Sequence, residues 1–181
     1  MALPDTQWPR YQVFVQEREG EPHLDYGSVH APDQEMALLN ARDVFVRRPE
    51  CVNIWVAPAD AIFARTAEEL ERGQPEVQGQ ETEEKKVLYH VFQKQRSAGT
   101  HQLVGQVEAG SPPEALAAAL EKFKGSDPFS WWVIPASVIL QSELEDIESM
   151  FAPAREKLFR MATDFHTHTA MRQIKQRIEE N

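Results

Sequence analysis

The sequence contains the same pattern twice. NIWVAPADAI at residues 53–62 returns as SWWVIPASVI at residues 130–139. The aligned positions of the first copy are Tyr11, Val13, Phe14, His23, Gly27, Ala37, Leu38, Ala41, Phe45, Trp55, Val56, Pro58 and Ile62. Their counterparts are Tyr89, Val91, Phe92, His101, Gly105, Ala115, Leu116, Ala119, Phe123, Trp132, Val133, Pro135 and Ile139. Two copies are too few for a solenoid, so residues 8–65 and 86–140 are predicted to form two similar units that pack together.

Each copy carries the same order of local signals. YQVFVQE and VLYHVFQK alternate and are rich in β-branched and aromatic residues, which is typical of strands. A polar turn that contains glycine follows, and then a second short strand around residues 25–30 or 103–108. After a helix comes a third strand, which contains the tryptophan and ends at Pro58 or Pro135. Each unit is therefore predicted to be β-β-α-β.

The helix of each copy has a recognisable start. Ser111 is followed by two prolines and Glu114, which gives an N-cap, a proline in the first turn and the glutamate of a capping box. Asp33 takes the cap position in the first copy. The spacing of Leu38, Ala41 and Phe45, and of their counterparts, places them on one helical face that should cover the sheet.

These signals predict an α+β protein. We expect two β-β-α-β repeats with mainly antiparallel sheets covered by helices, related by a pseudo-two-fold axis. Residues 66–85 are expected to be an acidic, solvated linker, because Glu and Gln dominate them. Residues 141–181 are expected to be a helical tail that starts near Pro153. Its apolar stripe consists of Leu158, Met161, Phe165, His168, Met171, Ile174 and Ile178.

One strand position indicates a second packed face. Tyr11 and Val13 face one side of the first strand, so Phe14 faces the other side among polar residues, and Phe92 repeats this in the second copy. This face is predicted to pack against the other copy or against a partner. The candidate packing or partner-interface residues are Phe14, Phe92, Trp55, Trp132, Leu158, Met161 and Phe165.

Charge and composition exclude several classes of function. With 19 Lys and Arg against 29 Asp and Glu, the formal charge is −10, so nucleic acid is not expected as a partner. No apolar run has the length of a signal peptide or a membrane span, so a membrane location is not expected. Cys51 is the single cysteine and cannot form an intrachain disulfide, which fits the cytoplasm.

Sequence motifs for catalysis are missing. There is no phosphate-binding glycine motif, no G-x-S-x-G and no H-E-x-x-H, and no histidine has a glutamate three residues before it. We therefore expect no catalytic, cofactor-binding or metal-binding residues. The weaker candidates are His23 and His101 in equivalent turns, His166 with His168, and Cys51. His23 and His101 are interpreted as polar turn residues, with paired ligands or bases as the alternative.

Several segments resemble one family. WPRYQVFVQ, GSVHA, MALLNARDVFVRR and NIWVAPADAI, between residues 8 and 62, are similar to the B subunit of the phenylacetyl-CoA epoxidase, the PaaB family of phenylacetate degradation. FAPAREKLFR at residues 151–160 resembles the segment that closes members of that family. A usual member is one unit followed by this tail, so the chain resembles a tandem form.

The resemblance implies a function. A PaaB subunit has no catalytic residues and no cofactor, and as a dimer it bridges the catalytic A and C subunits of a multicomponent monooxygenase. The di-iron centre belongs to the A subunit, and a reductase supplies electrons from NADPH. The resemblance therefore implies a bridging subunit in aerobic phenylacetate catabolism. Whether the tandem form replaces the dimer stays open, as does a homo-oligomer of the isolated chain.

Two alternatives from other classes remain. The chain could be a stand-alone, cofactor-independent α+β enzyme in which His23 and His101 act as acid and base. It could also be a small ligand-binding regulatory domain that uses the same residues.

Overall fold

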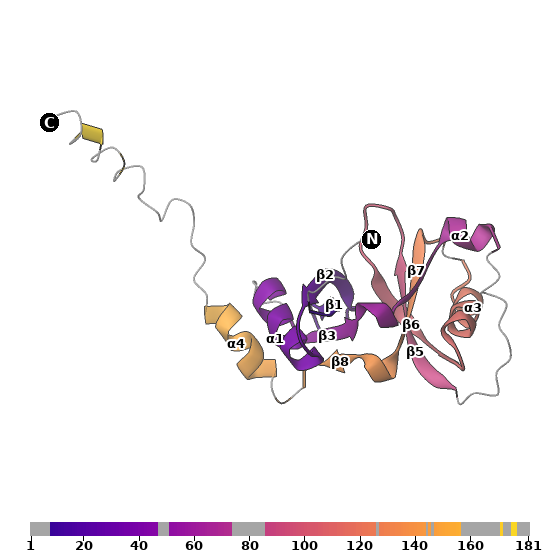
Figure 1. Cartoon of the computed structure of the whole chain (residues 1–181), viewed down its shortest axis with the longest axis horizontal. Coiled ribbons are helices and arrows are strands. Elements are labelled where there is room, and N and C mark those ends of the chain that lie inside the picture. Colours follow the sequence, from indigo (N-terminus) through magenta and orange to yellow (C-terminus); the bar gives the residue numbers. More distant parts are fainter. Residues whose placement is uncertain are drawn as a thin grey trace, which may run out of the picture.

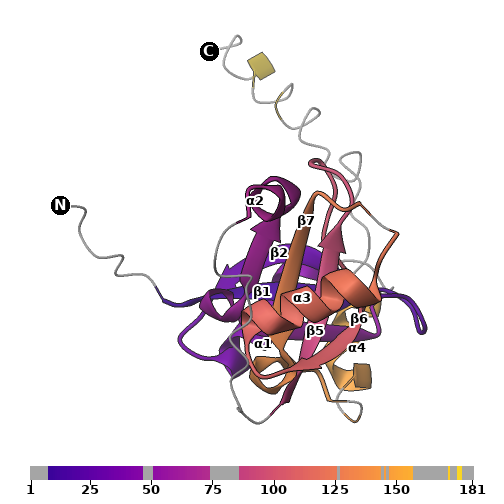
Figure 2. The ribbon, with the colours of Figure 1, turned by 90° about the vertical axis from the view of Figure 1, so that its right-hand side faces the viewer.

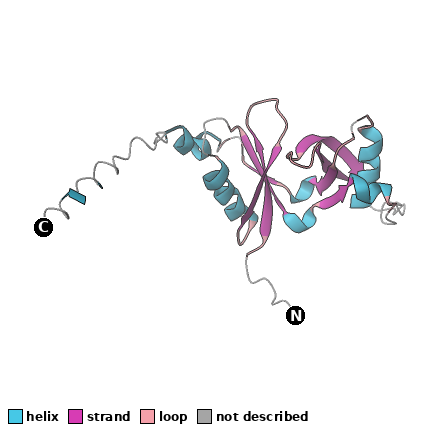
Figure 3. Cartoon of the chain, turned by 90° about the horizontal axis from the view of Figure 1, so that it is seen from above, coloured by secondary structure: helices cyan, strands magenta, loops and turns pink. Residues whose placement is uncertain are grey.

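The strands of both copies join in one antiparallel sheet with helices on its outer sides (Figures 1 and 3). The structure is a computed structural model that describes residues 8–46, 51–73, 86–125, 127–143, 145, 147–156, 171 and 175–176. The first copy contains β1 Arg10–Gln16, β2 Leu24–His30, α1 Gln34–Phe45, β3 Asn53–Pro58, the 3-10 turn η1 Ala59–Ala61 and β4 Phe63–Thr66, and α2 Ala67–Glu71 follows in the linker. The second copy contains β5 Val87–Lys94, β6 Gln102–Ala109, α3 Pro112–Lys122, β7 Ser130–Pro135, the 3-10 turn η3 Ala136–Val138 and β8 Leu140–Gln141, and α4 Ile147–Glu156 follows in the tail. The α+β class is confirmed.

The sheet has the strand order β4-β7-β5-β6-β2-β1-β3-β8. The four strands β8, β3, β1 and β2 form what we call the first half, and β6, β5, β7 and β4 form the second half. The halves meet where β2 runs beside β6. There the N–H of Asp25 donates to the carbonyl of His101 at 2.8 Å, and the N–H of Leu103 donates to the carbonyl of His23 at 2.9 Å. We call this junction the seam.

Each half contains one strand from the other copy. After η1, β4 pairs with β7 of the second copy, and after η3, β8 pairs with β3 of the first copy. The sequence did not predict these two strands, because four and two residues are too short to show a period. Their effect is that neither half of the sheet is built from a single copy.

The two long helices begin as expected. The side chains of Asp33 and Ser111 accept hydrogen bonds from backbone N–H groups in the first turns of α1 and α3. Glu114 differs in detail, because its carboxylate accepts from the N–H of Gly110 at 2.8 Å rather than from the N-cap residue. The helices lie on opposite sides of the strands (Figure 1), and Figure 2 shows α3 crossing β5, β6 and β7.

Glycine allows each helix to lie close to the sheet. The backbone φ of Gly27 is +119° and that of Gly105 is +156°, conformations that side chains rarely adopt. A Cβ added at Gly105 would stand 2.7 Å from the ring of Phe123, and one at Gly27 would stand 3.5 Å from the ring of Phe45. The aromatic ring that ends each helix therefore rests against a strand backbone without a side chain.

Apolar side chains fill three layers. One core lies between α1 and the first half, and it includes Val13, Ala41 and Val56. The equivalent core between α3 and the second half includes Val91 and Ala119. The third, which we call the inner layer, comprises Phe14, Ala57, Phe92 and Ile134, with Trp55, Ile62, Leu103, Trp132, Val138 and Ile139 packed around them.

Phe14 and Phe92 are at the centre of the inner layer. Both are fully buried, and their rings stack with centroids 4.3 Å apart and planes 29° apart. The ring of Trp132 meets Phe14 edge-on at 6.4 Å. Because Phe14 comes from β1 and Phe92 from β5, each copy covers the sheet face that the other could not bury by itself.

The linker and the tail differ from expectation where they are described. The segment 66–85 begins with α2, whose N-cap Thr66 and Glu69 form a capping box. The tail helix α4 begins at Ile147, before the expected start at Pro153, and Phe151 is buried in the core of the first half. Leu158, Met161 and Phe165 lie outside the described residues. No helix in the part of the chain that the structure describes is long and apolar enough to cross a membrane.

The inner layer predicts a large loss of stability when either phenylalanine is truncated. Phe14→Ala or Phe92→Ala should lower the free energy of unfolding of the isolated chain by about 3–5 kcal/mol, since each leaves a cavity in a fully buried layer. Phe14→Asp should cost more, because an unpaired carboxylate would be forced into an apolar contact. Urea unfolding measures the effect, with Leu39→Ala on the exposed side of α1 as the control. Unchanged unfolding midpoints in both phenylalanine variants would contradict this account of the inner layer.

Candidate functional site

The seam holds the two histidines that the sequence singled out. His23 directly precedes β2 and His101 directly precedes β6. Only 6% and 5% of their surfaces are exposed, so both are core residues rather than polar residues of a solvated turn. Their burial follows from the pairing of β2 with β6, which the sequence did not predict.

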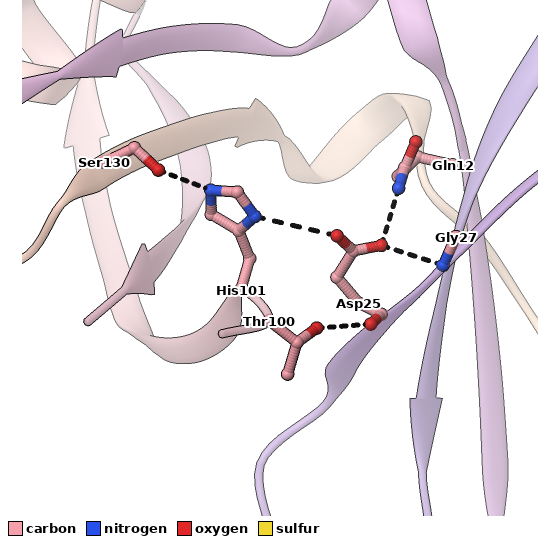
Figure 4. A network of polar contacts seen from close by, with 6 residues as sticks. All are labelled: Gln12, Asp25, Gly27, Thr100, His101 and Ser130. Atoms are coloured by element: carbon pink, nitrogen blue, oxygen red, sulfur yellow. Dashed lines mark hydrogen bonds and ion pairs between the residues drawn. The ribbon is translucent and has the colours of Figure 1, made fainter. Parts of the chain in front are cut away.

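His101 is held by contacts on both ring nitrogens (Figure 4) and by a further contact on the face of its ring. Its Nε2 lies 2.9 Å from Oγ of Ser130 at the start of β7, and its Nδ1 lies 3.6 Å from a carboxylate oxygen of Asp25 in β2. Its ring stacks on Trp132 at 3.5 Å. The contact with Asp25 crosses the seam, so this histidine ties the second copy to the first.

Asp25 is fixed by several donors (Figure 4). One carboxylate oxygen accepts from Nε2 of Gln12 at 2.5 Å and from the N–H of Gly27 at 3.0 Å. The hydroxyl of Thr100, from the other copy, donates to the carbonyl of Asp25. The carboxylate is thus oriented by its own copy, and its backbone is bonded to the other.

His23 has a matching position with different chemistry. Its ring stacks on Trp55 at 3.7 Å, and its Nε2 lies 3.3 Å from Oδ1 of Asn53. Asn53 is the counterpart of Ser130. The counterpart of Asp25 is Leu103, whose N–H donates to the carbonyl of His23, so the second copy supplies no carboxylate at that position. The seam is alike in shape on both sides and different in charge.

Two imidazoles contact the ring of Trp55. Besides His23, the ring of His90 lies 4.7 Å from it and tilted, and Nδ1 of His90 lies 3.4 Å from Nε2 of Gln106. Burial lowers the pKa of His23 to about 4; the Asn53 contact opposes this shift, and the nearby His90 adds to it. Burial also lowers the pKa of His90. Both imidazoles are therefore neutral at pH 7.

The order Asp25, His101, Ser130 is also that of a hydrolytic triad, but the surroundings do not fit catalysis. Ser130 is only 6% exposed, and a substrate carbonyl cannot approach its hydroxyl. The 3.6 Å separation of Asp25 and His101 is longer than a hydrogen bond. A general base must reach the proton that it removes, and neither His23 nor His101 faces solvent. These contacts are better explained as polar packing at the junction of the two copies than as a catalytic acid–base pair.

The remaining candidates are dispersed. Cys51 is buried, and burial raises the pKa of its thiol to about 12, so it is not poised as a nucleophile. His166 and His168 lie outside the described residues. Within the described ranges, no group of three His, Cys, Asp or Glu side chains is placed to hold a metal ion. Trp55 and Trp132 stand half-buried around the inner layer.

Sequence reasoning missed Asp25, Asn53, Ser130 and His90. A usable signal existed for two of them. Asn53 and Ser130 occupy equivalent positions two residues before the aligned tryptophans, and both are polar residues at the start of a strand. Their alignment with His23 and His101 could have indicated a paired contact.

Comparisons with known proteins agree with the resemblance. The family described as phenylacetic acid degradation B matches the chain twice, at residues 7–80 and at residues 85–172. The B subunit of the 1,2-phenylacetyl-CoA epoxidase of Escherichia coli K12 is 46% identical over 67 residues, which cover 37% of this chain and 70% of that protein. No solved structure matches significantly. The two family matches contain the two copies that the sequence repeat defines.

The buried histidines predict a loss of stability in acid. The unfolded chain takes up a proton on His23 near pH 6.5, whereas the folded chain resists until about pH 4. The unfolded state therefore binds more protons in this window, and stability falls as the pH falls from 6.5 to 4, by roughly 3 kcal/mol for His23 alone. Urea unfolding at several pH values should show a smaller acid loss in His23→Gln than in the wild type. His30→Gln, at an exposed position, is the control, and equal pH dependence in all three proteins would contradict the assignment.

Proposed function

Because the chain belongs to the phenylacetic acid degradation B family, we propose that it is a non-catalytic subunit that bridges the other subunits of a phenylacetyl-CoA epoxidase. The observation that carries the proposal is the double family match on one chain, together with the 46% identity to the B subunit of the E. coli epoxidase. Its partners are the catalytic subunits of A and C type, and it acts in aerobic phenylacetate catabolism in the cytoplasm.

The seam supports a structural rather than a catalytic role. Its histidines are buried, and His23 and His101 make their contacts with other protein groups. A catalytic acid or base has to exchange protons with substrate or solvent, and burial prevents this. In this proposal the epoxidation chemistry belongs to the partner subunits, and this chain supplies the surface that holds them together.

We further propose that the tandem chain takes the place of two separate B-type chains related by an approximate two-fold axis. Exchanging each strand for its counterpart turns the order β4-β7-β5-β6-β2-β1-β3-β8 into its own reverse, which is what such an axis produces. The two backbone hydrogen bonds of the seam also exchange with each other, since residues 23 and 25 are the counterparts of 101 and 103. A pair of identical chains would make these contacts at a two-fold interface.

The arrangement gives a mechanical account of bridging. The fully buried Phe14 and Phe92 fix the two halves against each other, and the exchanged strands β4 and β8 prevent them from sliding apart. The outer helices α1 and α3 are thereby held on opposite sides of the molecule (Figure 3). A bridge of this kind works by keeping the surfaces that bind different subunits at a constant separation and orientation, and these surfaces are not required to be equivalent on the two copies.

Co-expression tests the proposal. The chain should co-purify with the A- and C-type subunits of the same source as one complex, whose mass gives the number of copies of each component. The isolated chain should show no oxygenase activity and no stoichiometric iron. Phe14→Asp should abolish co-purification because it unfolds the bridge, whereas Arg96→Gln, in the exposed turn between β5 and β6, should not. The proposal is wrong if the wild-type chain elutes alone, or if it carries about one iron per chain that a substitution in its own residues removes.

A further inference from the structure

The two copies differ in what they expose. Four large apolar side chains of the first copy have between 39% and 61% of their surface exposed: Trp8, Met36, Leu39 and Val44. Their counterparts in the second copy are Lys86, Glu114, Ala117 and Lys122. The second copy also exposes large apolar side chains, Val87, Leu88 and Phe129, but none of them lies on α3. Met36 and Leu39 lie three residues apart on the exposed side of α1, and we call these two residues the α1 outer face.

Local contacts join the start of β1 to the exposed side of α1. Nδ1 of His30 lies 2.7 Å from the carbonyl oxygen of Trp8, and Nδ2 of Asn40 donates to the carbonyl of His30 at 3.2 Å. Asn40 stands one helical turn from Met36, on the same side of α1. The start of β1 and the outer side of α1 are therefore neighbours in space.

A groove of about 800 Å³ adjoins the first turn of α1. Its lining residues are Tyr11, Pro32, Asp33, Gln34, Glu35, Pro58, Ser137, Val138 and Leu140. Nε2 of Gln34 donates to the carbonyl of Val138 at 2.7 Å, which ties the helix start to η3. Asp33 and Glu35 are the only charged residues in this lining, and both are exposed. The groove is thus acidic, and it lies next to Met36.

We propose that the α1 outer face and this groove bind an amphipathic helix of a partner subunit, with Lys or Arg side chains of that helix over Asp33 and Glu35. Met36 and Leu39 form a ridge of the kind that packs between the side chains of a second helix. The acidic groove selects a basic neighbour by charge complementarity. This inference rests on the proposed function and adds to it the surface and the chemistry of the partner.

A second copy of the chain fits this surface less well. In a symmetric contact the same patch meets itself, so Asp33 and Glu35 would face the same acidic groups of the other copy. The formal charge of −10 adds to that repulsion. The charge pattern therefore favours a partner with basic side chains.

Equivalent positions on the two helices give a matched test. Leu39→Glu in α1 and Ala117→Glu in α3 add the same charge at exposed counterpart positions. Titration of the purified A- and C-type subunits with each variant should show a dissociation constant about tenfold or more higher for Leu39→Glu. Ala117→Glu should stay close to the wild type. Glu35→Gln should weaken binding less and reduce its dependence on salt concentration.

The outcomes separate this inference from the proposed function. If the wild-type chain binds the partner subunits and Leu39→Glu binds them equally well, the surface is wrong and the bridging function stands. If the wild-type chain does not bind them, both fail. If Ala117→Glu weakens binding to the partner subunits as much as Leu39→Glu does, the proposed difference between α1 and α3 is wrong. If the wild-type chain self-associates and Leu39→Glu abolishes that association, the surface binds a second copy of the chain and not a partner subunit. Melting temperatures verify folding, and Leu39→Gln replaces Leu39→Glu if the charge itself lowers the melting temperature.

Discussion

The stack of Phe14 on Phe92 is the contact on which the rest of the structure depends. A four-stranded sheet with a helix on one side leaves its other face uncovered, and within the described ranges neither copy has further elements to cover it. Each copy covers the other, and the two rings 4.3 Å apart mark the centre of that contact. Burying one phenylalanine contributes roughly 2–3 kcal/mol, a sizeable part of the net stability of a small protein. The exchanged strands and the seam surround this layer.

Polar contacts at the seam determine how the two halves align. Apolar packing alone is tolerant of small shifts, whereas the hydrogen bonds that cross the seam, from the N–H of Asp25 to the carbonyl of His101 and from the N–H of Leu103 to the carbonyl of His23, fix one register. The tryptophan beneath each imidazole links these contacts to the inner layer. Trp55 and Trp132 thus serve both kinds of packing, which accounts for their recurrence in the two copies.

Much of the fold could be predicted from the sequence because its signals are local or repeated. The caps at Asp33 and Ser111, the strand ends at Pro58 and Pro135, and the position of Phe14 on the second sheet face each follow from neighbours in the chain. The pairing of β4 with β7 and the burial of His23 depend on residues far away, and no local pattern encodes them. Asp25 could not be identified as a seam residue, because its counterpart Leu103 shares no chemistry with it.

The difference between the copies at the seam and on the outer helices has a consequence for stoichiometry. In a dimer of identical chains, any substitution appears twice, so each end of the dimer binds the same ligand. Here Asp25 and Leu103, or Leu39 and Ala117, stand in equivalent places and differ. Because the two copies lie in one chain, a substitution in one copy is not repeated in the other. The two ends of the molecule are therefore chemically distinguishable, and a partner that recognises one of these differences would bind once per chain, in a single orientation.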